Sequence, residues 1–139
     1  MHTKTNNFNM GREERVNYWV NIADYDYETA LALMETKRYL YVAFMSHQVI
    51  EKLLKAYWSK VLDEPPLKIH TLSRLAEISG ILSMMTQEQI DFILNIQPMN
   101  IESRYPEYMQ ELIKGLNMNV CQHYLDETEK FRTWIKEKL

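Results

Sequence analysis

The 139-residue sequence contains only three glycines and four prolines. Folds made of many short strands need frequent turns, and turns depend on these two residues. An all-β fold is therefore excluded, and long helices are favoured. Hydrophobic residues make up 46% of the chain and charged residues 25%, as in an ordinary folded domain that buries its own core.

Cysteine is rare, and long apolar runs and excess positive charge are missing. Cys121 is the single cysteine, which excludes an internal disulfide and is typical of a reducing compartment. No apolar run approaches the roughly 18 residues of a membrane span, and residues 1–15 lack the apolar core of a signal peptide. We therefore expect a cytoplasmic protein without membrane contact. With a net charge of −3, binding of RNA or DNA would need a local basic patch.

Hydrophobic periodicity predicts two long helices in the first half of the chain. Apolar residues recur at steps of three and four over residues 12–35 and again over 37–62. The second helix is expected to end at the sequence DEPP, residues 63–66, because proline cannot continue the hydrogen-bond ladder.

Shorter helices and one more long helix are predicted in the second half. Thr71 is a typical N-cap and Gly80 a typical end of one short helix. The next helix is expected to begin at Thr86, which has capping-box spacing with Gln89. A loop, a short helical piece and a last helix from about residue 117 or 119 follow. We predict an all-α, antiparallel up-and-down bundle of four to five main helices over residues 12–139, after a loose segment at 1–11.

Asp26 is the strongest anomaly in this pattern. On a helix of 3.6 residues per turn it shares a face with apolar residues on both sides, and so stands where a leucine is expected. These neighbours are Trp19, Ile22, Ala23, Ala30 and Leu33. An unpaired buried carboxylate is costly. Asp26 is therefore either a paired structural residue or one wall of a polar pocket, and His47, a lysine of the second helix or Arg104 could balance its charge.

A polar stripe runs along the second predicted helix, nearly opposite its apolar arc, and consists of Gln48, Lys52, Lys55 and Ser59. The simplest interpretation is a solvated face. The alternatives are a basic strip that binds phosphate and a surface for dimer formation.

Metal and cofactor sites are not indicated. His47 and Glu51 have a spacing that can place two ligands on one helix face, but no second pair accompanies them. Cys121 and His123 point to different faces, and no glycine-rich phosphate loop occurs. His70 is either a helix-entry residue or a ligand. We therefore predict neither a metal nor a cofactor.

The segment ESRYPEY, residues 102–108, groups an arginine, two tyrosines and a proline. Tyr105 can stack on a base, and Arg104 can bind a phosphate or a carboxylate with two hydrogen bonds. The alternative is structural, with Arg104 paired to an internal acid such as Asp26 or Glu51.

Four motifs together resemble the HEPN family. They are the acid Asp26 after an aromatic start, the QxxEKxxKA run at 48–56, the proline and His-x-Leu entry at 66–72, and the RYP triplet at 104–106. The similarity covers roughly residues 17–106. It implies a helical bundle, often a homodimer, and a frequent partnership with a small nucleotidyltransferase.

The resemblance also implies a ribonuclease motif that this chain lacks. Many HEPN proteins are metal-independent ribonucleases and toxins, with an arginine and a histidine separated by about four to six residues. No arginine here has a histidine at that distance. The nearest match runs from Asn117 to His123, and an asparagine carries no charge to stabilise a phosphorane-like transition state. We therefore lean towards a protein that is not an enzyme.

Three functions remain open. The first is a non-catalytic HEPN-like protein that binds a nucleotide, a partner nucleotidyltransferase, or both. Its candidate ligand-binding residues are Asp26, His47, Lys52, Lys55, His70, Arg104 and Tyr105. The second is an RNA-cleaving toxin of a toxin–antitoxin pair that uses His123 or His47. The third is a dimeric structural adaptor without a ligand, whose polar residues only fix the register of the helices.

Overall fold

The computed structural model describes residues 11–101 and 106–139. Its α-helices are α1 (Arg12–Glu35), α2 (Tyr39–Val61), α3 (Leu72–Ser79), α4 (Gln87–Ile96), α5 (Pro106–Lys114) and α6 (Met118–Lys136), with short 3-10 segments η1 (Ile81–Met84) and η2 (Gln97–Met99). No strand occurs within the described ranges. The predicted all-α class is confirmed.

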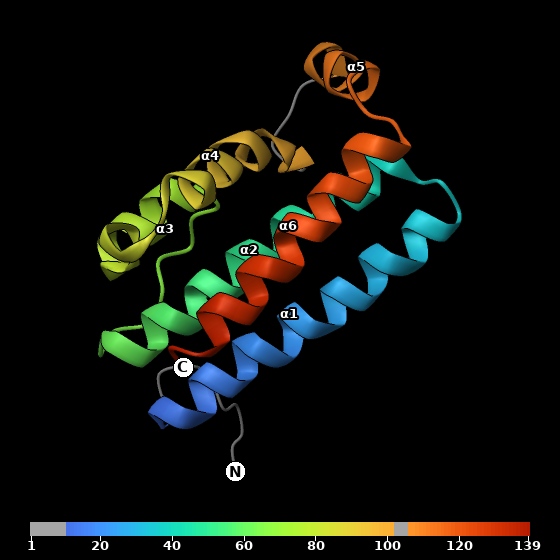
Figure 1. Cartoon of the computed structure of the whole chain (residues 1–139). Helices are drawn as coiled ribbons and strands as arrows, with labels where there is room; N and C mark the ends of the chain where they lie inside the picture. The colour runs from blue at the N-terminus through green and yellow to red at the C-terminus, as the bar shows by residue number, and fades with distance from the viewer. Residues whose placement is uncertain (1–10, 102–105) are drawn as a thin grey trace.

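Three long helices form the body of the molecule (Figure 1). Helix α2 returns antiparallel to α1, and α6 lies beside both and runs in the same direction as α2. Helices α3 and α4 cover another side of α2, and α5 projects from one end of the bundle. None of the α5 side chains is buried.

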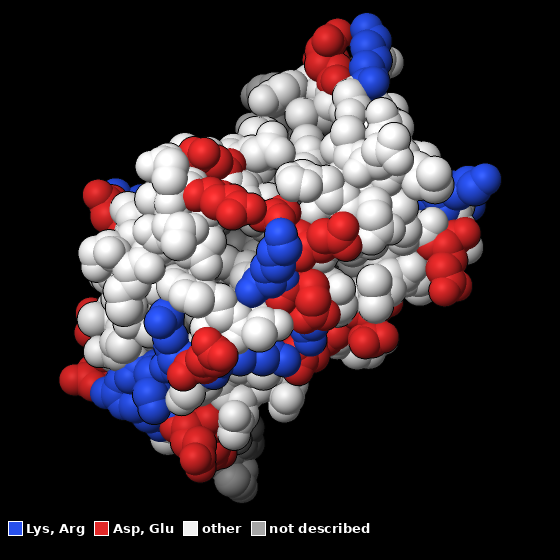
Figure 2. Space-filling view, in the orientation of Figure 1, with Lys and Arg blue, Asp and Glu red and all other residues white. Residues whose placement is uncertain are grey.

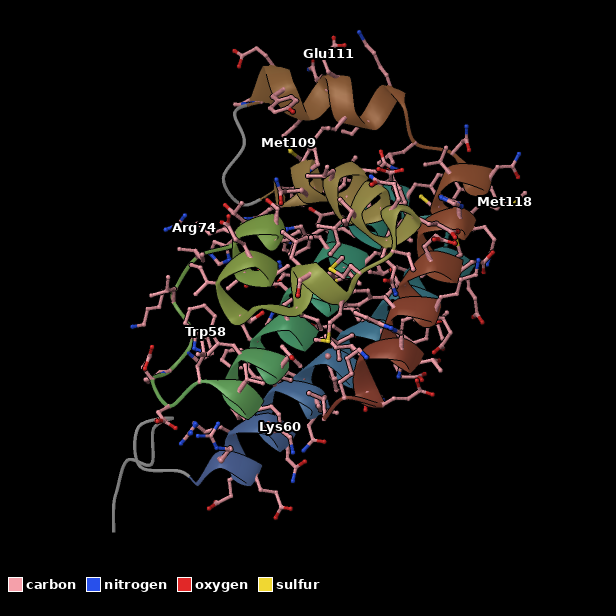
Figure 3. All side chains as sticks on the ribbon, turned by 60° about the vertical axis from the view of Figure 1, so that its left-hand side comes forward. Trp58, Lys60, Arg74, Met109, Glu111 and Met118 are labelled. Atoms are coloured by element: carbon pink, nitrogen blue, oxygen red, sulfur yellow. The ribbon has the colours of Figure 1, made fainter. Side chains whose placement is uncertain are left out.

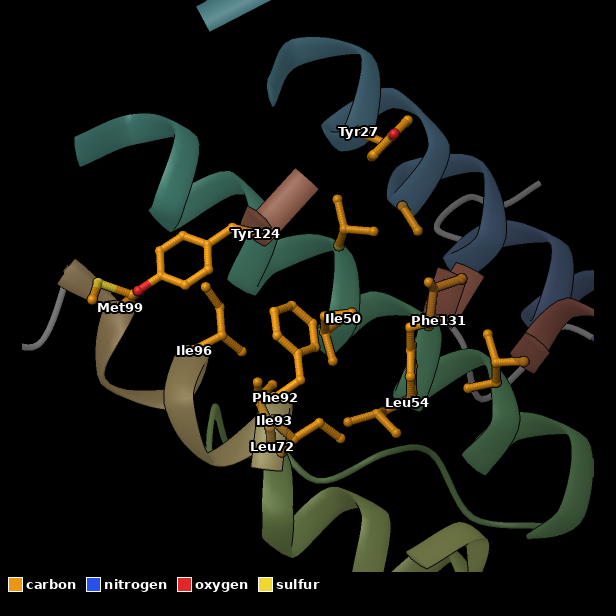
Figure 4. Packing of buried hydrophobic residues seen from close by; sticks show 14 of the residues in the cluster. Tyr27, Ile50, Leu54, Leu72, Phe92, Ile93, Ile96, Met99, Tyr124 and Phe131 are labelled. Atoms are coloured by element: carbon orange, nitrogen blue, oxygen red, sulfur yellow. The ribbon is translucent and has the colours of Figure 1, made fainter. Parts of the chain in front are cut away.

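Helix α2 is the centre of the core, because α1, α3, α4 and α6 all pack on it. Figure 4 shows Ile50 and Leu54 of α2 facing Leu72 of α3, Phe92 of α4 and Phe131 of α6. Each fully buried side chain of this kind contributes about 1.5–3 kcal/mol. A single cluster of buried residues thus joins the helices on both sides of α2.

The predicted helix ends are confirmed where local capping determines them. The hydroxyl of Thr86 accepts from the backbone N–H of Gln89 at 3.1 Å, and the side chain of Gln89 accepts from Thr86 N–H at 2.8 Å. Gly80 ends α3 with φ of +89°, a left-handed conformation that favours glycine. Helix α4 ends at Ile96 and is followed by a 3-10 turn that contains Pro98.

Helix α1 has the predicted ends but a different buried line, which runs along Val16, Ala23, Tyr27 and Ala30. The prediction that Asp26 lies at the centre of this face is wrong, because it does not count Tyr27 as apolar. Tyr27 occupies the centre, with the guanidinium of Arg132 from α6 at 4.2 Å from its ring centroid. Asp26 lies one residue away, at the edge of the buried line.

Arg104 and Tyr105 of the RYP triplet lie outside the described residues, as do residues 1–10 of the predicted loose segment. The division into a loose segment and one domain therefore stays a prediction. Of the helices in the described part of the chain, none has the length and apolar character needed to cross a membrane.

Candidate functional site

The polar stripe of α2 is mostly buried, so the interpretation as a solvated face is wrong. Ser59 is fully buried, Lys55 is only 6% exposed, and Gln48 and Lys52 are half-buried. Helix α1 packs along α2, and residues 62–71 return beside α2, where the indole N–H of Trp58 donates to the carbonyl of Glu64 at 2.9 Å. Figure 3 shows this returning segment next to Trp58.

Glu51 is the centre of the resulting polar cluster. Its side chain is 2% exposed and accepts from Lys55 Nζ at 3.0 Å and from His70 Nδ1 at 3.0 Å. The ammonium of Lys55 also lies 5.4 Å from the centroid of the Trp19 ring. Burial raises the pKa of Glu51, but Lys55 and His70 more than offset it and hold the pKa below its usual value. Glu51 is therefore ionised at neutral pH.

His47 is fully buried on the same helix. Its Nδ1 lies 3.9 Å from Glu51 Oε1 and 3.4 Å from Gln48 Nε2, and the backbone of His70 also interacts with the imidazole. Burial lowers the pKa of His47 to about 4, although the charge of Glu51 acts in the opposite direction. The imidazole is therefore neutral at neutral pH.

Of the predicted partners, Asp26 pairs with a lysine of α2 and not with His47. Its carboxylate lies 3.7 Å from Lys52 Nζ, and the two side chains are 15% and 17% exposed. The same ammonium donates to Gln48 Oε1 at 2.6 Å. Burial raises the pKa of Asp26, and the charge of Lys52 only partly offsets this effect. This pair forms the outer edge of the cluster around Glu51.

The Asp26→Ala variant is expected to lose only about 1 kcal/mol of unfolding free energy, because Lys52 keeps access to water once its partner is removed. Urea unfolding of the variant and of the wild type measures the difference. A loss of about 3 kcal/mol or more, the cost of breaking a fully buried pair, would contradict the partial exposure of this site.

The structure brings together the predicted site residues that it describes and adds one that sequence reasoning left out of the site. The predicted residues are Asp26, His47, Lys52, Lys55 and His70. The addition is Glu51, which contacts three of them. A signal for it was present, because Glu51 is the acid of the QxxEKxxKA run, four residues from both His47 and Lys55.

A reactive cysteine is not part of this site. Cys121 is buried on α6, where its thiol lies 3.5 Å from the carbonyl of Tyr39, and burial raises its pKa to about 11. Within residues 11–101 and 106–139, no three His, Cys, Asp or Glu side chains are grouped so that they could hold a metal ion.

Comparison with known proteins identifies the family. A family model described as the HEPN domain matches residues 16–139. The chain belongs to the HEPN family. The solved structure described as TT1696 from Thermus thermophilus is similar to this HEPN chain, with a TM-score of 0.71 and 17% sequence identity, covering 90% of this chain and 98% of that chain. At this identity the likeness shows a shared fold. A comparison with curated proteins found no match.

Asn117 and His123, the nearest match to the ribonuclease motif of HEPN proteins, have other roles or surroundings in this chain. Asn117 is the N-cap of α6, and its side-chain oxygen accepts from the backbone N–H of Val120 at 2.9 Å. His123 is exposed and lines a hollow of about 510 Å³ together with Glu88, Asp91 and Glu127. Figure 2 shows acidic side chains gathered over this face of α4 and α6. Glu127 is paired with Lys130, whose ammonium lies 2.9 Å away, so the face around His123 carries positive as well as negative charge.

Proposed function

We propose that this HEPN-domain protein is a non-catalytic binding protein, which takes up a nucleotide at the polar site of α2 and works with a nucleotidyltransferase. The main support for this proposal is the buried charge cluster around Glu51. The cluster reaches the surface at His70, whose side chain is 59% exposed. The nucleotidyltransferase partner and a homodimeric state are proposed on the basis of the family alone.

Stability alone does not explain why charged residues form the cluster around Glu51. Glu51, Lys55 and His47 are nearly or fully buried, and a buried ion pair contributes no more stability than well-packed apolar residues of similar volume. The fold therefore does not require charges at these positions. A ligand with phosphate groups and a polar base does use them, because its charges need donors and acceptors already held in place.

The exposure of each side chain suggests its role. The ammonium of Lys52 donates to Gln48 Oε1 at 2.6 Å and lies 3.7 Å from Asp26, and its third N–H can donate to a phosphate. The exposed imidazole of His70 offers a second donor beside it. Lys55 is too deeply buried to be the first contact, and it instead fixes Glu51, which in turn orients His70.

The remaining candidates complete the proposed site. The neutral His47 lies beside Glu51 on α2, with its Nδ1 3.9 Å from Oε1. Arg104 and Tyr105, which lie outside the described residues, are proposed from the sequence to bind phosphate and to stack on the base.

Titration calorimetry with ATP tests the proposal. Wild-type protein should bind, whereas Lys52→Ala and Arg104→Ala should each weaken the affinity at least about tenfold. The control is Lys114→Ala, which removes a lysine from an exposed ion pair on α5 and should leave the affinity unchanged.

Two outcomes would contradict the proposal. If the wild type gives no binding heat, or if Lys52→Ala binds ATP as well as Lys114→Ala does, the adaptor without a ligand becomes the better account. Metal-free cleavage of RNA that is lost in His123→Ala would overturn the non-catalytic part and favour the toxin.

A further inference from the structure

The segment 62–71, here called the strap, connects α2 to α3 and lies over the polar site of α2. The indole N–H of Trp58 donates to a backbone carbonyl of the strap at 2.9 Å, and His70 Nδ1 lies 3.0 Å from Glu51. Figure 3 shows the strap next to Trp58. Glu51, Lys55 and Trp58 share one face of α2, at steps of four and three residues. The strap therefore covers the ion pair of Glu51 with Lys55.

This cover separates the ion pair from solvent. Glu51 is 2% exposed and Lys55 is 6% exposed, whereas the side chain of His70 on the strap is 59% exposed. A phosphate group that approaches from solvent can reach His70 but not the ammonium behind it. Unless the strap moves, the deepest charges of the site make no contact with a ligand.

The strap has the features of a segment that opens without unfolding of the rest of the protein. None of its residues is buried, and its apolar residues Leu62 and Ile69 pack on the core only in part. Residues 65–69 make no hydrogen bond with any residue that the structure describes. Segments with few buried apolar groups and few backbone hydrogen bonds open at a lower free-energy cost than the whole fold.

Polar contacts hold the strap near its two ends. At the first end, the guanidinium of Arg12 from α1 pairs with Asp63. At the other end, the side chain of His70 contacts Glu51, and its backbone interacts with the imidazole of His47. These contacts, together with the indole bond, set most of the cost of opening.

The middle of the strap is stiff, because Pro65 and Pro66 fix φ and leave an open strap few conformations to gain. We propose that the strap is a lid, which opens while the helices stay folded, admits a phosphate group of a nucleotide to Lys55, and closes over it. A nucleotide that contacts both Lys52 of α2 and His70 of the strap joins the two and holds the lid shut. The lid role rests on the proposed nucleotide site.

Hydrogen exchange of the Trp58 indole N–H, followed by NMR in the whole chain, measures opening of the lid, because Trp58 is 2% exposed and bonded to the strap. The backbone amide of Leu54, in the fully buried core of α2, reports unfolding of the whole protein. Relative to its intrinsic rate, the indole should exchange at least about 100-fold faster than this amide. Equal protection of the two groups would overturn the proposal.

Two variants separate opening of the lid from global unfolding. His70→Ala removes the bond to Glu51 and should speed exchange at both Trp58 and Leu54 at least about tenfold, because the closed state loses stability relative to the open and the unfolded states alike. Ile135→Val, in the fully buried core of α6, should speed exchange of Leu54 about fivefold and leave Trp58 unchanged. If Ile135→Val speeds both groups equally, Trp58 exchanges only by global unfolding, and the lid is excluded.

ATP tests the closed state. At about 100 times its dissociation constant it should slow exchange of the Trp58 indole about 100-fold, because a ligand that binds only the closed lid shifts the equilibrium by mass action. If ATP slows exchange at Leu54 but not at Trp58, it binds whether the lid is open or closed, so the nucleotide site stands and the lid is overturned. If calorimetry gives no binding heat, the nucleotide site fails, and the lid role fails with it.

Discussion

Replacement of Glu51 by alanine is expected to lower the free energy of unfolding by about 3–5 kcal/mol, as for other buried ion pairs that lose one partner. The variant leaves the ammonium of Lys55, which is 6% exposed, without the carboxylate that lies 3.0 Å away. It also removes the acceptor of His70 Nδ1. Urea unfolding followed by circular dichroism measures the loss, with the wild type as reference.

Two further variants make this result specific to the buried pair. Glu111→Ala breaks the exposed pair with Lys114 and should cost no more than about 1 kcal/mol. The double variant Glu51→Leu with Lys55→Met removes both buried charges and should recover most of the loss. If Glu51→Ala costs no more than Glu111→Ala, the cluster around Glu51 is open to water and the proposed site loses its main support.

Helix ends could be predicted from the sequence because they depend on neighbouring residues. Thr86 and Gln89 satisfy each other's backbone groups within one turn, and Gly80 adopts a conformation that few other residues tolerate. The Asn117 cap of α6 is equally local. None of these interactions needs information about the rest of the fold, so the beginnings and ends of the helices follow from short stretches of sequence.

Burial of the α2 polar stripe could not be predicted in this way. Periodicity divides one helix into an apolar and a polar face, but it does not say which other segment covers the polar face. Here residues 62–71 return along α2 and bring His70 to Glu51 from 19 positions away. The charges then satisfy one another, so a face that looks solvated in the sequence is buried without a large penalty.

Acid is expected to destabilise the protein mainly through His47, by about 3 kcal/mol between pH 6.5 and about 4. The pKa of this buried imidazole is lowered from 6.5 to about 4 in the folded state. In this range the unfolded chain binds a proton that the folded protein does not, so stability is complete above pH 6.5 and falls as the pH approaches 4. A difference of roughly 2.5 pKa units corresponds to about 3 kcal/mol.

The charged groups that face His47 do not cancel this effect. They are Glu51, Lys52 and His70, and their influence is already contained in the lowered pKa. Glu51 has its own pKa lowered from 4.5, so its contribution is present above pH 4.5 and is lost only as the pH falls further. His47 therefore dominates between pH 6.5 and 4.5, and the two residues act in the same direction below that.

Urea unfolding at a series of pH values tests this with two histidine variants. His47→Gln removes the titrating group and should flatten the dependence of unfolding free energy on pH between 4.5 and 6.5, whatever its effect at neutral pH. His123→Gln, at an exposed position of α6, should keep the slope of the wild type. If the unfolding free energy of His47→Gln changed with pH as steeply as that of the wild type, the pKa of His47 in the folded protein would not be lowered. Water would then reach the interior of the Glu51 cluster.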